Sequence, residues 1–193
     1  MKRHTMLMIS MLVVVSALPI EAAAPTNNGN NEKSVVEKLE PNIGVSKESR
    51  EVTGDLLNKL LGDFYLLYVK VQNYHWNVVG PMFNDLHLFF GKLYDQLADI
   101  VDKVAERIRA LGIRAKGSLT EFLQEARLTE EPGVYPPALQ MVRNLLNDYE
   151  VIIRAIRDDV ENVKEMDLGT NTLLSDLIVC LEKKAWMLRS YLQ

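Results

Sequence analysis

Four long stretches of the chain repeat apolar residues every three or four positions, the spacing of an α-helix with one buried face. They predict helices over residues 53–78, 82–111, 138–165 and 172–192. The second stretch holds about thirty residues, which is long for a globular helix and suits a helix bundle. The apolar stripes of the first two helices are Leu56, Leu57, Leu60, Leu61, Phe64, Leu67, Tyr68 and Val71, then Leu86, Phe90, Leu93, Leu97, Ile100, Val104, Ile108 and Leu111.

The connection between the second and third helices holds a further helical signal. Gly112 ends the second helix as a C-terminal cap. Residues 118–126 predict a short helix, with Ser118 as N-cap and Glu121 at the capping-box position. We therefore predict an all-α fold, a four-helix bundle with a short extra helix in a long crossover.

The first 52 residues lack this pattern. Residues 1–24 combine a basic start, an apolar run over 6–18 and small residues at the end, which is typical of a cleaved secretory signal peptide. An uncleaved anchor or a mis-chosen start codon are the alternatives. Residues 25–52 are rich in Asn, Gly, Pro and charge, and we predict a flexible linker there. The bundle domain is then 53–193.

Charge and cysteine content exclude several classes of protein. The net charge of −4 argues against a general nucleic-acid binder. Cys180 is the only cysteine, so the chain has no internal disulfide and no cysteine-based zinc site. The linker also lacks a basic patch for phosphate. Its charges balance as Lys33, Lys38, Lys47 and Arg50 against Glu32, Glu37, Glu40 and Glu48.

Two histidines and two carboxylates are candidate metal ligands. His75 and His87 flank the turn at 80–81, so antiparallel helices would bring them to the same height. Asp102 and Glu106 are four residues apart and share a helix face. His87 and Asp102, however, lie fifteen residues apart on one helix, roughly 22 Å at 1.5 Å per residue. One chain cannot bring all four to one ion, but two antiparallel copies about a two-fold axis can. Taken alone, the carboxylates would be a solvated face and the histidines hydrogen-bonded interior residues.

Two sets of residues carry a family pattern. They are His75-Trp76-Asn77, Gly80-Pro81, His87, Asp102 and Ala105-Glu106-Arg107-Ile108, then Glu182-Lys183-Lys184-Ala185-Trp186-Met187-Leu188-Arg189. Together they resemble the signature of the Dps miniferritins, the ferritin-like proteins of starved bacteria. The resemblance covers about residues 53–193.

The resemblance implies a hollow shell of twelve subunits that oxidises Fe(II), with H2O2 as the expected oxidant, and stores ferric iron against oxidative damage. His75 and His87 would be ligands from one chain, and Asp102 and Glu106 ligands from its partner. These four residues would form a ferroxidase centre, where zinc would also fit as a competitor. With a signal peptide, the place of work would be the bacterial periplasm, and without one the cytoplasm. DNA binding by the tail is not expected.

The chain departs from the family pattern at Gly91. The family usually has Asp or Glu four residues after the second histidine, and glycine supplies no ligand. A metal-sequestering shell with slow oxidation is therefore one alternative, and a structural or DNA-protecting assembly is another. Tyr65, Tyr68 and Tyr74 could carry electrons, but aromatic residues at helical spacing are usually core. Asp167 matches a pore carboxylate of the family.

Overall fold

The computed structural model describes residues 39–162 and 167–193. The predicted signal peptide and most of the predicted linker lie outside the described residues. Residues 40–193 form one compact unit. No helix in the described part is both long and apolar enough to cross a membrane.

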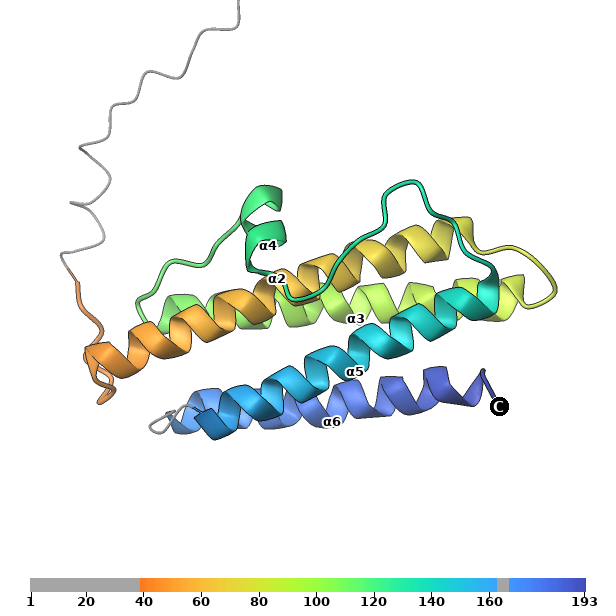
Figure 1. Cartoon of the computed structure of the whole chain (residues 1–193). Helices are drawn as coiled ribbons and strands as arrows, with labels where there is room; N and C mark the ends of the chain where they lie inside the picture. Colours follow the sequence, from red (N-terminus) through yellow and green to blue (C-terminus); the bar gives the residue numbers. More distant parts are fainter. Residues whose placement is uncertain (1–38, 163–166) are drawn as a thin grey trace, which may run out of the picture. The chain divides into compact units, whose positions relative to one another are not determined.

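Four long helices and one short helix make up the described structure (Figure 1). α2 (Lys47–Asn77) and α3 (Phe83–Ala110) form one antiparallel pair, and α5 (Ala138–Asn162) and α6 (Leu168–Ser190) form the other. The short α4 (Leu119–Glu125) packs on α2. The long crossover that contains α4 lets α5 run in the same direction as α3. This is the predicted ferritin-like four-helix bundle with an extra helix in the crossover.

The apolar stripes predicted from the sequence form the core. Every stripe residue of α2 and α3 is buried except Tyr68, which is half-buried. The second pair contributes Val142, Leu145, Tyr149, Ile152, Ile156, Leu174, Leu177, Leu181 and Leu188. The hydrophobic effect on these faces therefore holds the two layers together.

The predicted ends of α3 and α4 are confirmed by their caps. Gly112 has φ +79°. The amides of Gly112 and Ile113 donate to the carbonyls of Arg109 and Ile108, which closes α3 in a Schellman motif. Ser118 and Glu121 form the complete capping box of α4.

Two helices begin earlier than predicted. α2 starts at Lys47 and not at Thr53, because the Ser46 hydroxyl accepts the amide of Ser49 as an N-cap. Arg50 is consequently buried in the bundle, with 6% of its surface exposed. Its guanidinium donates to the Glu40 carboxylate and to the carbonyl of Leu111. The last residues assigned to the linker are therefore helical. α6 starts at Leu168 and not at Thr172, since Asp167 caps it.

Candidate metal centre

A tight turn brings the two candidate histidines together. α2 ends at Asn77 and α3 begins at Phe83, and between them Gly80 adopts φ +106°, a conformation open to glycine. The rings of His75 and His87 stack with centroids 3.8 Å apart and planes 18° from parallel. The sequence prediction that these histidines lie at the same height is confirmed.

Reciprocal hydrogen bonds orient both rings. Nδ1 of His75 lies 2.7 Å from the carbonyl oxygen of His87, and Nδ1 of His87 lies 2.9 Å from the carbonyl oxygen of His75. A carbonyl oxygen only accepts, so each Nδ1–H must donate. Each neutral ring then carries its lone pair on Nε2, the atom left to bind a metal ion. Hydrogen bonds to two backbone carbonyls thus leave Nε2 of both imidazoles available as candidate metal ligands.

Aromatic rings enclose the histidine pair on two sides. Phe83 stacks on His87 at 5.1 Å between centroids, and Tyr94 meets His75 edge-on at 5.1 Å. Both histidines are half-buried, so the pair lies at the surface of the subunit. Neighbouring aromatic rings pack against the two imidazoles, which remain partly exposed to solvent.

Gly91 faces the histidine pair. A Cβ atom at this position would lie 3.4 Å from Cε1 of His75, an ordinary van der Waals contact. A methyl group would therefore fit there, in contact with the His75 ring. The structure places the departure from the family pattern directly beside the candidate ligands.

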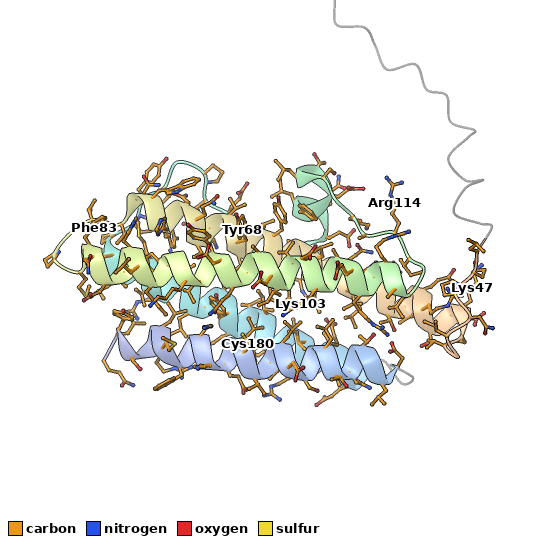
Figure 2. The ribbon with its side chains drawn as sticks, turned by 180° about the vertical axis from the view of Figure 1, so that it is seen from behind. Lys47, Tyr68, Phe83, Lys103, Arg114 and Cys180 are labelled. Carbon is orange, nitrogen blue, oxygen red and sulfur yellow. The ribbon has the colours of Figure 1, made fainter. Side chains whose placement is uncertain are left out.

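The two candidate carboxylates lie far along α3 from the histidines. Asp102 and Glu106 are both exposed. Figure 2 marks the separation, with Phe83 near one end of α3 and Lys103, beside Asp102, further along the helix. Among the described residues of one chain, no group of three or more His, Cys, Asp or Glu side chains is placed to hold a metal ion. The structure brings the histidines together and leaves the carboxylates apart.

Asp167 is the N-cap of α6 and forms an ion pair within the bundle. Its carboxylate accepts the amide and the hydroxyl of Thr170 and forms an ion pair with Arg107. Burial opposes its ionisation, but these hydrogen bonds and the Arg107 charge hold the pKa of Asp167 below its ordinary value. The carboxylate matched to a family pore is thus a helix cap in this subunit.

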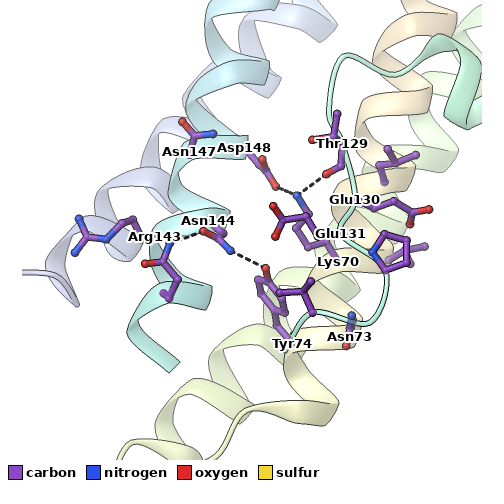
Figure 3. A pocket seen from close by; sticks show the side chains of 15 residues that line it. Lys70, Asn73, Tyr74, Thr129, Glu130, Glu131, Arg143, Asn144, Asn147 and Asp148 are labelled. Carbon is purple, nitrogen blue, oxygen red and sulfur yellow. Dashed lines mark hydrogen bonds and ion pairs between the residues drawn. The ribbon is translucent and has the colours of Figure 1, made fainter. Parts of the chain in front are cut away.

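A polar pocket between α2, α5 and the crossover was not predicted from the sequence (Figure 3). Its volume is about 530 Å³. Lys70 donates to Asp148 at 2.5 Å and to the carbonyl of Thr129 at 2.9 Å, and Asn144 donates to the Tyr74 hydroxyl at 3.0 Å. Burial raises the pKa of Asp148, although the hydrogen bond from Lys70 opposes this. The partners come from distant segments, so no local signal reveals them.

Comparisons with known proteins give the same architecture. A family model for the ferritin-like domain matches residues 54–193. A low temperature-induced protein from Nostoc sp. is 44% identical over 154 residues, which are 79% of this chain and 86% of that protein. DNA protection during starvation protein 2 from Bacillus anthracis is 35% identical over 139 residues, covering 72% of this chain and 94% of that protein.

Solved structures agree with these sequence matches. The Dps protein from Vibrio cholerae O1, described as a member of a superfamily of ferritin-like diiron-carboxylate proteins, matches with a TM-score of 0.75 and 30% identity. The match covers 80% of this chain and 98% of that one. DpsC from Streptomyces coelicolor matches with a TM-score of 0.77 and 29% identity over 81% of this chain and 91% of that one. The chain therefore belongs to the Dps family of ferritin-like proteins.

Proposed function

We propose that the protein binds Fe(II) between paired subunits and oxidises it, and that its oligomeric shell stores the ferric product. The observation that carries this proposal is the histidine pair. His75 and His87 are locked in the tautomer that leaves Nε2 free, and imidazole nitrogen is a good ligand for iron. Zinc accepts the same ligands and would compete for the site.

The carboxylates of a second subunit complete the ligand set in this proposal. Asp102 and Glu106 of the partner would supply oxygen ligands, which favour the harder Fe(III) once it forms. Exposed apolar side chains beside the histidines support a partner surface there, because monomers rarely leave such groups clustered in water. They are Trp76, Val79, Phe83 and Leu88, and Trp76 is 66% exposed. A shell of twelve subunits is the assembly that the family resemblance favours.

Hydrogen peroxide is the oxidant in this proposal. It accepts electrons from the bound Fe(II). The reaction consumes both Fe(II) and H2O2, which would otherwise react with each other to form hydroxyl radical. The family includes relatives named for DNA protection during starvation. In this chain we attribute protection to iron oxidation and not to DNA binding by the tail. Two of the tail's four cations are already engaged, since Arg50 pairs with Glu40 and Lys47 with Glu51.

Gly91 favours a second candidate function, a shell that sequesters iron but oxidises it slowly. Position 91 faces His75, yet glycine brings no ligand there. Export to the periplasm, proposed from the first 24 residues, is compatible with both functions.

The test compares Fe(II) oxidation by H2O2 and by O2 in the purified protein and three variants. We expect fast oxidation with H2O2, and loss of it in His75→Ala/His87→Ala. Asp99→Ala is the control, since Asp99 is also an exposed carboxylate of α3 but is not a proposed ligand. Slow oxidation that Gly91→Asp accelerates would instead favour the sequestering shell. If the wild type and the double-histidine variant both behave like free iron, the proposed site is wrong.

A further inference from the structure

Three tyrosines form a continuous row that starts at the histidine pair. The Tyr94 ring contacts the His75 ring with 5.1 Å between centroids. Tyr68 follows at 6.1 Å from Tyr94, and Tyr65 at 6.0 Å from Tyr68. The row passes from α3 to α2 and runs along α2 away from the metal centre, and Figure 2 labels its middle member, Tyr68.

The row differs from ordinary core packing in two respects. All three rings are half-buried, whereas Tyr149 is fully buried in the core. The Tyr68 hydroxyl also accepts a hydrogen bond from Gln72 at 3.3 Å, so its own O–H remains available to donate. Beyond Tyr65 the next ring is Phe122, stacked at 4.2 Å, which has no hydroxyl. The row of oxidisable rings thus ends at Tyr65.

The reaction proposed above needs an electron source besides one iron ion. Two imidazoles and two carboxylates suffice for one ion, and position 91, which faces His75, brings no further ligand. Fe(II) gives up one electron, but reduction of H2O2 to water takes two. With a single ion at the centre, a one-electron step would release hydroxyl radical unless another group supplies the second electron at once.

We propose that Tyr94, Tyr68 and Tyr65 form a relay that supplies this second electron. This inference rests on the proposed function. Fe(II) becomes Fe(III) and one tyrosine becomes a neutral tyrosyl radical, so two electrons reach H2O2. The O–O bond breaks, and two waters form from the peroxide, the phenolic proton and one proton from solvent. The half-buried phenols lose that proton to water. Transfer along the row moves the radical from Tyr94 toward Tyr65, away from the metal ligands.

A second Fe(II) resets the relay. It returns one electron to the tyrosyl radical, which takes up a proton and becomes tyrosine again, while the ion becomes Fe(III). Over the full cycle two Fe(II) are therefore consumed per H2O2. When no second Fe(II) is available, the first turnover consumes only one Fe(II) per H2O2, because a tyrosine supplies the other electron. This difference in stoichiometry distinguishes the relay from simple pairwise oxidation of iron.

The experiment uses the assembled full-length protein without oxygen, loaded with less than one Fe(II) per subunit, and then one equivalent of H2O2. Rapid freezing and EPR spectroscopy detect the radical, and peroxide assays give the ratio of iron to peroxide. We expect a tyrosyl radical and a ratio near one in the wild type. In Tyr94→Phe we expect the tyrosyl radical yield to fall strongly and hydroxyl radical, detected with a spin trap, to be released in its place. The control is Tyr191→Phe, because Tyr191 packs on Phe89 at 5.5 Å, outside the row.

The outcomes separate the relay from the function on which it rests. Fe(II) binding and oxidation that depend on His75 and His87, with no radical and a ratio of two in the wild type, would overturn the relay alone. The relay would also be overturned if Tyr94→Phe and Tyr65→Phe/Tyr68→Phe both gave the same radical yield as the wild type. Loss of the radical in Tyr94→Phe but not in Tyr191→Phe supports it. Circular dichroism and native mass of each variant confirm that the shell is intact.

Discussion

At the scale of single residues, Gly91 gives up helix stability without a steric reason. Glycine inside a helix costs about 1 kcal/mol relative to alanine. Its backbone φ is not positive, and a Cβ atom would only touch Cε1 of His75 at 3.4 Å. We therefore expect Gly91→Ala to raise the free energy of unfolding by about 0.5–1 kcal/mol in urea denaturation. A loss of stability would mean that the space beside His75 is tighter than this contact indicates.

A second residue-scale prediction concerns Asp63, a fully buried carboxylate. It accepts the amides of Arg127 at 2.5 Å and Leu128 at 3.2 Å and pairs with the Arg127 guanidinium at 2.7 Å. Asp63→Ala leaves these donors without their acceptor, so we expect a loss of about 3–5 kcal/mol in urea unfolding. The control is Glu182→Ala, whose ion pair with Arg157 is exposed and should contribute less than about 1 kcal/mol. Equal losses in both would contradict the importance of burial.

At the scale of helices, periodicity predicted the elements but not all their ends. The apolar residues of α2 and α3 recur every three or four positions, and they formed the core as predicted. The sequence did not reveal Ser46 and Asp167 as N-caps. The residues that follow them, such as Arg50 and Gly169, do not continue the apolar repeat from which the helix starts were predicted. Arg50 becomes buried only through Glu40 and the Leu111 carbonyl, and no local pattern reveals a contact 61 residues away.

The candidate site was predictable to a similar degree. Spacing about the turn predicted that His75 and His87 meet, and the structure confirms it. Their tautomer depends on two backbone carbonyls, and the row from Tyr94 to Tyr65 depends on how two helices pack, so neither could be read from the sequence. The roles of Asp102 and Glu106 remain predictions, because they depend on a proposed contact with a second subunit.

An element-scale prediction concerns the start of α6. Asp167→Ala removes the N-cap and the ion pair with Arg107, and we expect a loss of about 1–2 kcal/mol at pH 7. Because the folded-state pKa of Asp167 is lowered, its contribution is complete above the unfolded-state pKa, near 4, and disappears as pH falls through the folded-state value. The difference between wild type and variant in urea unfolding should therefore shrink below about pH 4.

The same measurement on Asp167→Asn separates the cap from the charge. Asparagine caps helices about as well as aspartate, so this variant should keep most of the stability at pH 7. It carries no titrating carboxylate and should show no pH-dependent contribution from this position. A difference between wild type and Asp167→Ala that stays constant down to low pH would contradict the role of the ionised carboxylate.

At the scale of the whole molecule, the proposed assembly has each subunit contribute half of two metal sites. His87 lies near the start of α3, beside His75 of α2, and Asp102 lies roughly 22 Å from His87 along α3. The proposed centre therefore exists only where two subunits meet antiparallel, and a two-fold axis makes two such centres per pair. Activity should then follow the composition of the pair and not that of the single chain.

Co-assembly of two inactive variants tests this arrangement directly. His75→Ala/His87→Ala keeps the carboxylates, and Asp102→Ala/Glu106→Ala keeps the histidines. In shells built from equal amounts of both, half of the subunit pairs are mixed, and one of the two centres in each mixed pair has all four ligands. We therefore expect about a quarter of the wild-type rate of Fe(II) oxidation. The control co-assembles His75→Ala with His87→Ala, because both histidines of a centre come from one chain and no centre is restored. Activity in the control, or none in the first mixture despite confirmed mixed shells, would show that the ligands are not divided between subunits in this way.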